Sequence, residues 1–300
     1  MRAKLRNVLS SSTREKIVLS SGIVLDGPVG ASVGQAGTAV LFALCGARAL
    51  CAKVGPQAIV RREWAAMAAV HGDGARIAPT VVRAEMCEDL PSSSGIKRAA
   101  LLLPLFPLSL ADASAALPCG PGRARDALAA SAALCGLAAI AAFMRAGWAH
   151  GDIKPANIML AGGSSAACVL IDLGTARPIG DTFTESSLFS LNEQRVASTS
   201  YDLVCLGATL AMLQLEIFVE EGVTTRASLL AAVKQAARAV PGARPPASLV
   251  AEAVLSLAAN LNADLGIDAL RALAEEVAKD CEALGAPSLN DVWPHDAIAP

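Results

Sequence analysis

A short polar segment interrupts a long apolar stretch in the middle of the chain. The segment reads HGDIKPANIML, from His150 to Leu160, and it places Asp152, Lys154 and Asn157 close together. Asp152 can accept or orient the proton of a hydroxyl group, and Lys154 can neutralise a phosphoryl group in transfer. The amide oxygen of Asn157 suits a hard cation such as Mg²⁺. An acid, a base and an amide in one loop suit phosphoryl transfer, because this reaction depends on metal ions, positioning and charge compensation.

A second acidic residue follows in the segment LIDLGTA, where Asp172 comes after apolar residues and precedes Gly174. The carboxylate of Asp172 and the amide of Asn157 supply two oxygen ligands, so we predict that these residues bind Mg²⁺ or Mn²⁺. We expect the apolar residues on either side of both loops to anchor them rigidly, as accurate positioning of reacting groups demands.

The N-terminal part of the chain contains residues that suit a nucleotide clamp. In the segment SVGQAGTAV, Gly34 and Gly37 can let backbone amides approach phosphate oxygens. Lys53 follows in a strand-like run, CAKV, and Glu63 lies on a predicted helix, where it can pair with the lysine. Each residue alone also has a simpler interpretation, as part of an ordinary turn, a surface lysine or a solvated helix residue.

The order of these motifs resembles that of the eukaryotic-type protein kinase family. The resemblance implies that Lys53 binds the α- and β-phosphates of ATP and that Glu63 pairs with this lysine. It implies that Asp152 is the catalytic aspartate, and that Asn157 and Asp172 hold the metal ion. HGDIKPAN followed by IDLG is the most specific part of this pattern.

The resemblance spans roughly residues 20–220. Within this range Lys154 is typical of family members that phosphorylate serine or threonine. Asp202, in the segment SYDLVCLGATL, matches the aspartate that braces the catalytic loop, and Leu173 stands where the family more often has phenylalanine.

These residues imply an ATP-dependent serine/threonine protein kinase that transfers the γ-phosphate of ATP to a protein hydroxyl. Its partners would be ATP, with Mg²⁺ or Mn²⁺, and a protein substrate with a Ser or Thr acceptor. A second hypothesis is a pseudokinase that acts as a binding or regulatory module. A third is a small-molecule kinase of the aminoglycoside or choline type, which the HGD triplet and the short segment after Asp172 fit.

The sequence departs from the family pattern at several positions. Ser32 stands where the first glycine of the phosphate loop is usual, and no Ala-Pro-Glu motif is present. Glu193 is the nearest substitute for the glutamate of that motif, with Arg271 as its candidate partner. The spacing from Lys53 to Glu63 is shorter than usual, which implies a trimmed helix or an early helix start.

Gly151 replaces the arginine that commonly precedes the catalytic aspartate. In the family that arginine contacts a phosphate on the activation loop, so its absence weakens the physical basis for control by phosphorylation. We therefore predict that activity does not require phosphorylation of the hydroxyls at Thr182, Thr184, Ser186 and Ser187.

The pattern of apolar residues predicts an α+β chain with two lobes, and the resemblance implies that this bilobal fold is protein-kinase-like. A small β-rich N-lobe covers 17–103, a hinge covers 104–108, and a larger helical C-lobe covers 109–300. Within the N-lobe, short apolar runs between turn residues predict antiparallel strands over 17–60 and further strands near 79–86 and 98–103. Residues 57–70 have helical spacing and stop at the breaker cluster His71-Gly72-Asp73-Gly74.

Composition restricts the possible partners and compartment. The 300 residues are 54% hydrophobic with a net charge of −2, so the chain can bury a core and has no basic excess for nucleic acid. Eight cysteines include no Cys-x-x-Cys pair, and their apolar neighbours indicate reduced thiols and a cytoplasmic location. Residues 1–16 are expected to form a flexible basic arm, with an organelle-targeting peptide as the alternative.

One segment imitates a membrane span. Residues 127–144, ALAASAALCGLAAIAAFM, are nearly all apolar, but half of them are alanine and the run leads straight into the polar loop at His150. We therefore predict a buried helix that delivers this loop, and no membrane partner. For the final residues, 286–300, the sequence supports only a packing role for Trp293.

Overall fold

The computed structural model describes the following residues: 14–28, 39–45, 48–72, 76–91, 97–118, 122–161, 167–184, 187–191, 194–217, 225–239, 246–260, 266–281, 284 and 287–296. The glycine loop with Gly34 and Gly37 lies outside them, as do Glu193 and most of the predicted N-terminal arm.

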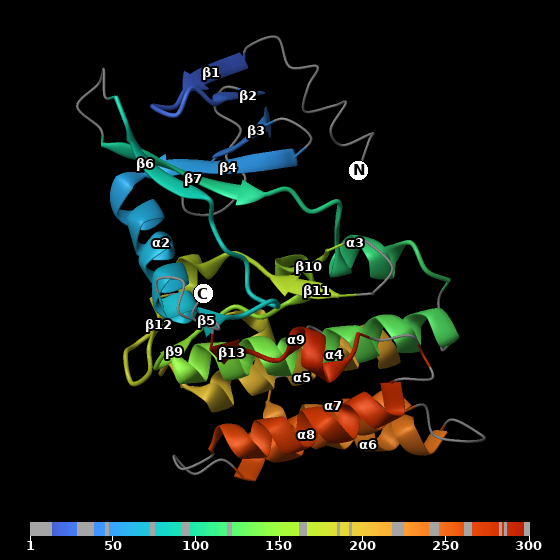
Figure 1. Cartoon of the computed structure of the whole chain (residues 1–300). Helices are drawn as coiled ribbons and strands as arrows, with labels where there is room; N and C mark the ends of the chain where they lie inside the picture. The colour runs from blue at the N-terminus through green and yellow to red at the C-terminus, as the bar shows by residue number, and fades with distance from the viewer. Residues whose placement is uncertain are drawn as a thin grey trace. The chain divides into compact units, whose positions relative to one another are not determined.

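Figure 1 shows the arrangement of the elements within each part of the chain. The strands are β1 (Arg14–Val18), β2 (Val24–Pro28), β3 (Ala39–Cys45), β4 (Arg48–Pro56), β5 (Arg76–Ile77), β6 (Met86–Leu90), β7 (Arg98–Pro104), β8 (Leu108–Ser109), β9 (Trp148–Ala149), β10 (Ile158–Leu160), β11 (Cys168–Leu170), β12 (Arg177–Pro178) and β13 (His295–Asp296). The α-helices are α2 (Gln57–His71), α3 (Leu110–Ala115), α4 (Arg123–Arg145), α5 (Thr199–Leu215), α6 (Arg226–Ala239), α7 (Pro246–Asn260), α8 (Ile267–Cys281) and α9 (Leu289–Val292). Three short 3₁₀ helices are η2 (Pro155–Asn157), η3 (Leu173–Thr175) and η4 (Leu188–Ser190).

The chain divides into two compact units. The first contains Met1–Ala68 and Val82–Pro107, and the second contains Ala69–Val81 and Leu108–Pro300. The chain passes from the first unit to the second at Pro107, inside the segment 104–108 expected to be the hinge. The second unit also takes Ala69–Val81, a stretch that the sequence pattern grouped with the N-lobe.

The first unit is built on a six-stranded sheet in the order β1-β2-β3-β4-β7-β6. All of its paired neighbours run antiparallel, which confirms the strands predicted within 17–60 and near 98–103. Since β1 begins at Arg14, the sheet includes three residues assigned by the sequence pattern to the flexible arm. One face of the sheet carries a core of Leu19, Leu25, Leu50, Ala52, Val54, Leu90, Ala100 and Leu102.

Side chains alternate between faces along β4, as the pleat requires. Ala52 and Val54 are buried in this core, so Cys51 and Lys53 point to the opposite face. Helix α2 begins at Gln57, directly after β4, and ends at His71, as its spacing predicted. The helix thus starts early, which accounts for the short separation between Lys53 and Glu63.

The strand predicted near 79–86 is misplaced. β6 begins only at Met86, and Val81 instead makes an isolated parallel bridge with Leu170 of the second unit. The Leu170 amide donates to the Thr80 carbonyl at 2.8 Å, so this segment pairs outside the six-stranded sheet. The apolar pattern indicated burial correctly, but a local pattern does not show which core receives the side chains.

The second unit is built around α4, which is buried along most of its length. α4 contacts α5, α7 and α8, and also the short strands β9 and β11 (Figure 1). A β-carbon added at Gly136 would lie 2.6 Å from Leu206 Cδ1, so this glycine allows α4 and α5 to approach closely. By length and composition α4 alone among the described helices could cross a membrane, yet 83% of its most apolar window is buried inside the structure. The predicted buried helix is therefore confirmed.

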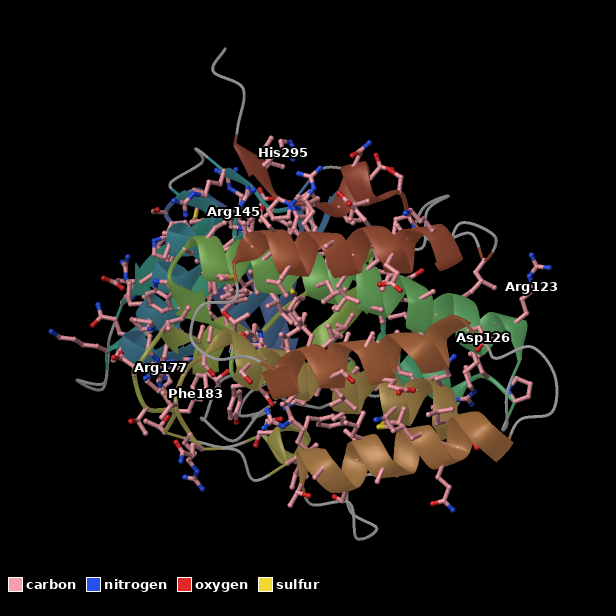
Figure 2. All side chains as sticks on the ribbon, turned by 90° about the horizontal axis from the view of Figure 1, so that it is seen from below. Arg123, Asp126, Arg145, Arg177, Phe183 and His295 are labelled. Carbon is pink, nitrogen blue, oxygen red and sulfur yellow. The ribbon has the colours of Figure 1, made fainter. Side chains whose placement is uncertain are left out.

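The C-terminal residues lie against the end of α4. Arg145 donates from Nη1 to the Pro294 carbonyl at 2.8 Å, and Figure 2 shows Arg145 beside His295. β13 then pairs with β5, joining His295 to Ile77. Trp293 is only 6% exposed, which agrees with the packing role expected for it.

Candidate active site

The polar loop lies between two short strands of the second unit. It leaves β9 after Ala149, passes through η2, and enters β10 at Ile158. β10 pairs with β11 in a register that places Ile158 opposite Leu170, and the Ile171 amide donates to the Asn157 carbonyl at 2.8 Å. This pairing brings the end of the polar loop next to the start of the segment that carries Asp172.

Three side chains predicted to do chemistry meet in this loop. Lys154 Nζ lies 2.6 Å from Asp152 Oδ2, and Asn157 Nδ2 donates to the same oxygen at 3.0 Å. Asn157 Nδ2 also donates to the Asp152 carbonyl at 2.9 Å. Two donors on one carboxylate oxygen fix the orientation of Asp152, while its other oxygen, Oδ1, accepts no hydrogen bond from any residue described in the structure.

Asp202 holds the backbone just before Asp152. Its Oδ2 accepts from the His150 amide at 2.7 Å, and its Oδ1 accepts from the Gly151 amide at 2.8 Å. Burial raises the pKa of the Asp202 carboxyl, while the hydrogen bonds from the two backbone amides act in the opposite direction. A buried carboxylate that accepts two amide hydrogens is the brace that the sequence pattern assigned to this residue.

His150 has a structural role in the same loop. Its Nδ1 accepts from the Asp152 amide at 3.2 Å, so Nε2 carries the proton that points to the Ile171 carbonyl at 3.1 Å. The ring also packs edge-on against Phe143 of α4 at a centroid distance of 5.4 Å. The buried helix therefore positions the loop through an aromatic contact, as its place in the sequence suggested.

Asp172 occupies a left-handed conformation, with φ 64° and ψ 66°. This region costs a residue other than glycine about 1 kcal/mol or more, and such strain is concentrated at functional sites. η3 follows immediately, and Thr175 Oγ1 donates to the His150 carbonyl at 2.8 Å. The segment with Asp172 is thus fastened to the loop with Asp152.

The residues predicted to hold a metal ion are suited to Mg²⁺ or Mn²⁺. The Asn157 amide nitrogen is taken by Asp152, so Oδ1 is the atom that can face a cation. Asp172 supplies a carboxylate. The described residues contain no cluster of three or more His, Cys, Asp or Glu side chains. Two oxygen donors suit a cation that takes its remaining ligands from water and substrate phosphates.

The first unit contains the predicted Lys53–Glu63 ion pair. Lys53 Nζ lies 2.8 Å from Glu63 Oε2, with Glu63 fully buried and Lys53 18% exposed. Arg61 of the same helix pairs with Asp89 of β6 at 3.0 Å, which ties α2 to the sheet. A carboxylate buried with one lysine fixes that lysine's ammonium group, as a phosphate-binding role requires.

The structure does not test the predicted pair of Glu193 and Arg271. Arg271, the candidate partner of Glu193, donates from Nε to Glu275 at 3.1 Å, one turn along α8. Glu193 itself lies outside the described residues. Sequence reasoning missed Phe183, which lies in a hydroxyl-rich segment and is nevertheless buried beside Gly151. The single aromatic residue among exposed polar neighbours was the available signal.

Comparison with protein-family models finds no match, and comparison with curated proteins finds none either. Among solved structures, the chain is similar to the structure of vaccinia related kinase 3, with a TM-score of 0.62. The two share 12% sequence identity, and the match covers 96% of each chain. The chain therefore has a protein-kinase-like fold, with a β-rich N-terminal region and a helical C-terminal part.

Proposed function

We propose that this protein is an ATP-dependent serine/threonine protein kinase. The observation that carries the proposal is the hydrogen-bonded group of Asp152, Lys154 and Asn157 in the loop between β9 and β10. A decayed site has no physical need to keep a carboxylate fixed by two donors with one oxygen left for a hydroxyl group. The Lys53–Glu63 pair and the strained Asp172 support the same proposal.

Each residue has a distinct role in the proposed reaction. Asp152 orients the acceptor hydroxyl and takes its proton, and Lys154 compensates the charge of the phosphoryl group in transfer. Lys53 binds the α- and β-phosphates and is held in place by Glu63. Asn157 and Asp172 would hold Mg²⁺ with their side-chain oxygens, and the ion would supply charge compensation at the phosphates.

The acceptor class is tested by following the label from γ-labelled ATP. We expect the purified protein, with Mg²⁺ and a generic basic protein, to place label on serine and threonine. The Asp172→Ala variant should lose this transfer together with Mg²⁺-dependent nucleotide binding. Asp268→Asn, an exposed aspartate on α8, is the control and should behave like the wild type.

Other outcomes would replace the proposal. Label on sugars or amino alcohols, with none on protein, would assign a small-molecule kinase, a hypothesis that the HGD triplet keeps open. Tight Mg²⁺–ATP binding without transfer to any acceptor would assign a pseudokinase.

A further inference from the structure

Gly151, directly before Asp152, occupies a position that no other residue fits. Its φ is +81°, a conformation that residues with a β-carbon rarely adopt. A β-carbon built there would lie 2.4 Å from Cε1 and 2.8 Å from Cζ of Phe183. Carbon atoms that are not bonded to one another do not come this close. The Phe183 ring therefore occupies the space of any side chain at Gly151.

Phe183 is buried between exposed neighbours. The ring is 2% exposed, whereas both neighbouring threonines, Thr182 and Thr184, are exposed. Its amide donates to the Arg195 carbonyl at 2.8 Å. Figure 2 shows Phe183 at the same end of the second unit as Arg177, which begins β12. One aromatic side chain is therefore directed inward from this segment.

The ring of Phe183 reaches the residues that support the catalytic loop. It packs against Tyr201 at a centroid distance of 4.7 Å with an interplanar angle of 47°. Tyr201 lies in the first turn of α5, next to Asp202, whose Oδ1 accepts the Gly151 amide. Gly151 is thus fixed twice, by a hydrogen bond from its amide and by van der Waals contact at its α-carbon.

We propose that Phe183 is a positioning residue for Asp152, and that it holds the described residues of 177–198 against the catalytic loop through Gly151. The inference rests on the proposed function and adds how that site is kept ordered. In this arrangement a buried aromatic contact orders the segment against the catalytic loop. In the kinase family a contact between a phosphate and an arginine commonly has this role. An arginine at position 151 would collide with the ring, so the two devices exclude one another.

The first test removes the ring. In Phe183→Ala we expect hydrogen exchange of the His150 and Gly151 amides to accelerate by at least about tenfold, because the loop opens more often. We expect kcat to fall by about tenfold or more while KM for ATP changes by less than about twofold, because Lys53 and Glu63 are unaffected. Phe183→Leu, which keeps apolar volume and preserves folding, should show smaller changes in the same direction.

Phe189→Ala is the matched control. Phe189 lies in η4 of the same segment, and the substitution removes the same side chain. We expect it to leave exchange at His150 and Gly151 at the wild-type rate.

A second test examines the contact itself. Gly151→Ala should destabilise the protein strongly, because its β-carbon meets Phe183 and because its φ is positive. With Phe183→Ala already in place, Gly151→Ala should cost less stability, since the collision disappears while the backbone strain remains. The two losses in the free energy of unfolding, measured by urea denaturation, should therefore be less than additive.

These experiments can disprove the positioning role of Phe183 separately from the proposed kinase function. Hydrogen exchange reports on the loop even if no phosphoryl transfer is ever detected. Wild-type exchange at Gly151 in folded Phe183→Ala and Phe183→Leu would overturn the positioning role. So would fully additive losses from Gly151→Ala and Phe183→Ala, because the ring would then not occupy the space at Gly151.

Discussion

At the scale of single residues, the candidate site depends on which oxygen atoms are already taken. Both donors at Asp152 bind Oδ2, so Oδ1 is the oxygen that can meet a hydroxyl group. At Asp202 the situation is reversed, because both oxygens accept backbone amides. The Asp152 carboxylate thus keeps one oxygen available, whereas both oxygens of Asp202 hold the loop.

Replacing Asp202 with Asn should separate these roles. An amide has one acceptor oxygen, and its NH₂ group would face a backbone N–H, so one amide of the His150–Gly151 pair loses its partner. We expect Asp202→Asn to lower the free energy of unfolding by roughly 2–3 kcal/mol, measured by urea denaturation. Asp268→Asn, the same change at an exposed site, should alter it by less than about 0.5 kcal/mol. Equal stability of the two variants would contradict the brace.

Cys51 gives a pH-dependent prediction in the first unit. Burial raises the pKa of its thiol to about 11, so at pH 8 only about 0.1% of it is thiolate, the form that reacts. We expect iodoacetamide to modify Cys51 in the folded protein far more slowly than in urea, with a rate that rises as pH approaches 11. Mass spectrometry of peptides after timed reaction measures this. Equal rates for folded and unfolded protein at pH 8 would show that Cys51 is exposed.

At the scale of elements, the sequence predicted the helices and strands whose local pattern of apolar residues matches the contacts that they make in the fold. Helix α2 and the buried helix α4 follow from apolar spacing and breakers, and the strand with Lys53 follows from alternation. The run near 79–86 was misplaced because Val81 pairs with Leu170, which is distant in sequence. Phe183 was missed for the same reason, since its burial depends on a glycine and a tyrosine in other elements.

The start of α4 is joined to the end of α5 by a buried arginine. Arg125 donates to the carbonyls of Leu213 and Pro118, each at 3.0 Å, and pairs with Glu216 at 3.3 Å. A buried guanidinium with several acceptors suits the core of a folded unit rather than a lipid bilayer. It is a polar contact that apolar spacing cannot reveal.

Arg125→Met should therefore destabilise the second unit. The substitution removes the donor to the buried Leu213 carbonyl and to the partly buried Pro118 carbonyl, and we expect a loss of roughly 2–4 kcal/mol in the free energy of unfolding. Arg123→Met is the control, because Arg123 is exposed at the same end of α4 and points outward in Figure 2. A loss of similar size in both variants, by thermal or urea unfolding, would argue against a specific role for Arg125.

At the scale of the whole molecule, the residues proposed to act in phosphoryl transfer are divided between the two compact units. The first unit holds the Lys53–Glu63 pair, and the second holds the loop with Asp152 and the segment with Asp172. The motif order indicated this division, because lysine and glutamate precede the hinge and the other residues follow it. At 12% identity to a solved kinase, the fold itself is the common feature.

The contact between Phe183 and Gly151 also bears on whether activity requires phosphorylation. Because Phe183 fills the space at Gly151, we expect order in the described residues of 177–198 to be independent of a phosphate group. We expect a variant with all four segment hydroxyls replaced by alanine, at Thr182, Thr184, Ser186 and Ser187, to keep kcat within about threefold of wild type. Phosphatase-treated wild type should match it. Complete loss of transfer in both preparations would show that activity requires phosphorylation.

The most direct measurement compares phosphoryl transfer by the wild type and by Asp152→Asn, with Mg²⁺–ATP binding followed in parallel. Asparagine keeps the size of the side chain but cannot accept the hydroxyl proton. We predict a fall in transfer of about a hundredfold or more with nucleotide binding nearly unchanged, because Lys53 and Asp172 remain. Transfer at the wild-type rate in Asp152→Asn would contradict the catalytic role of the loop between β9 and β10.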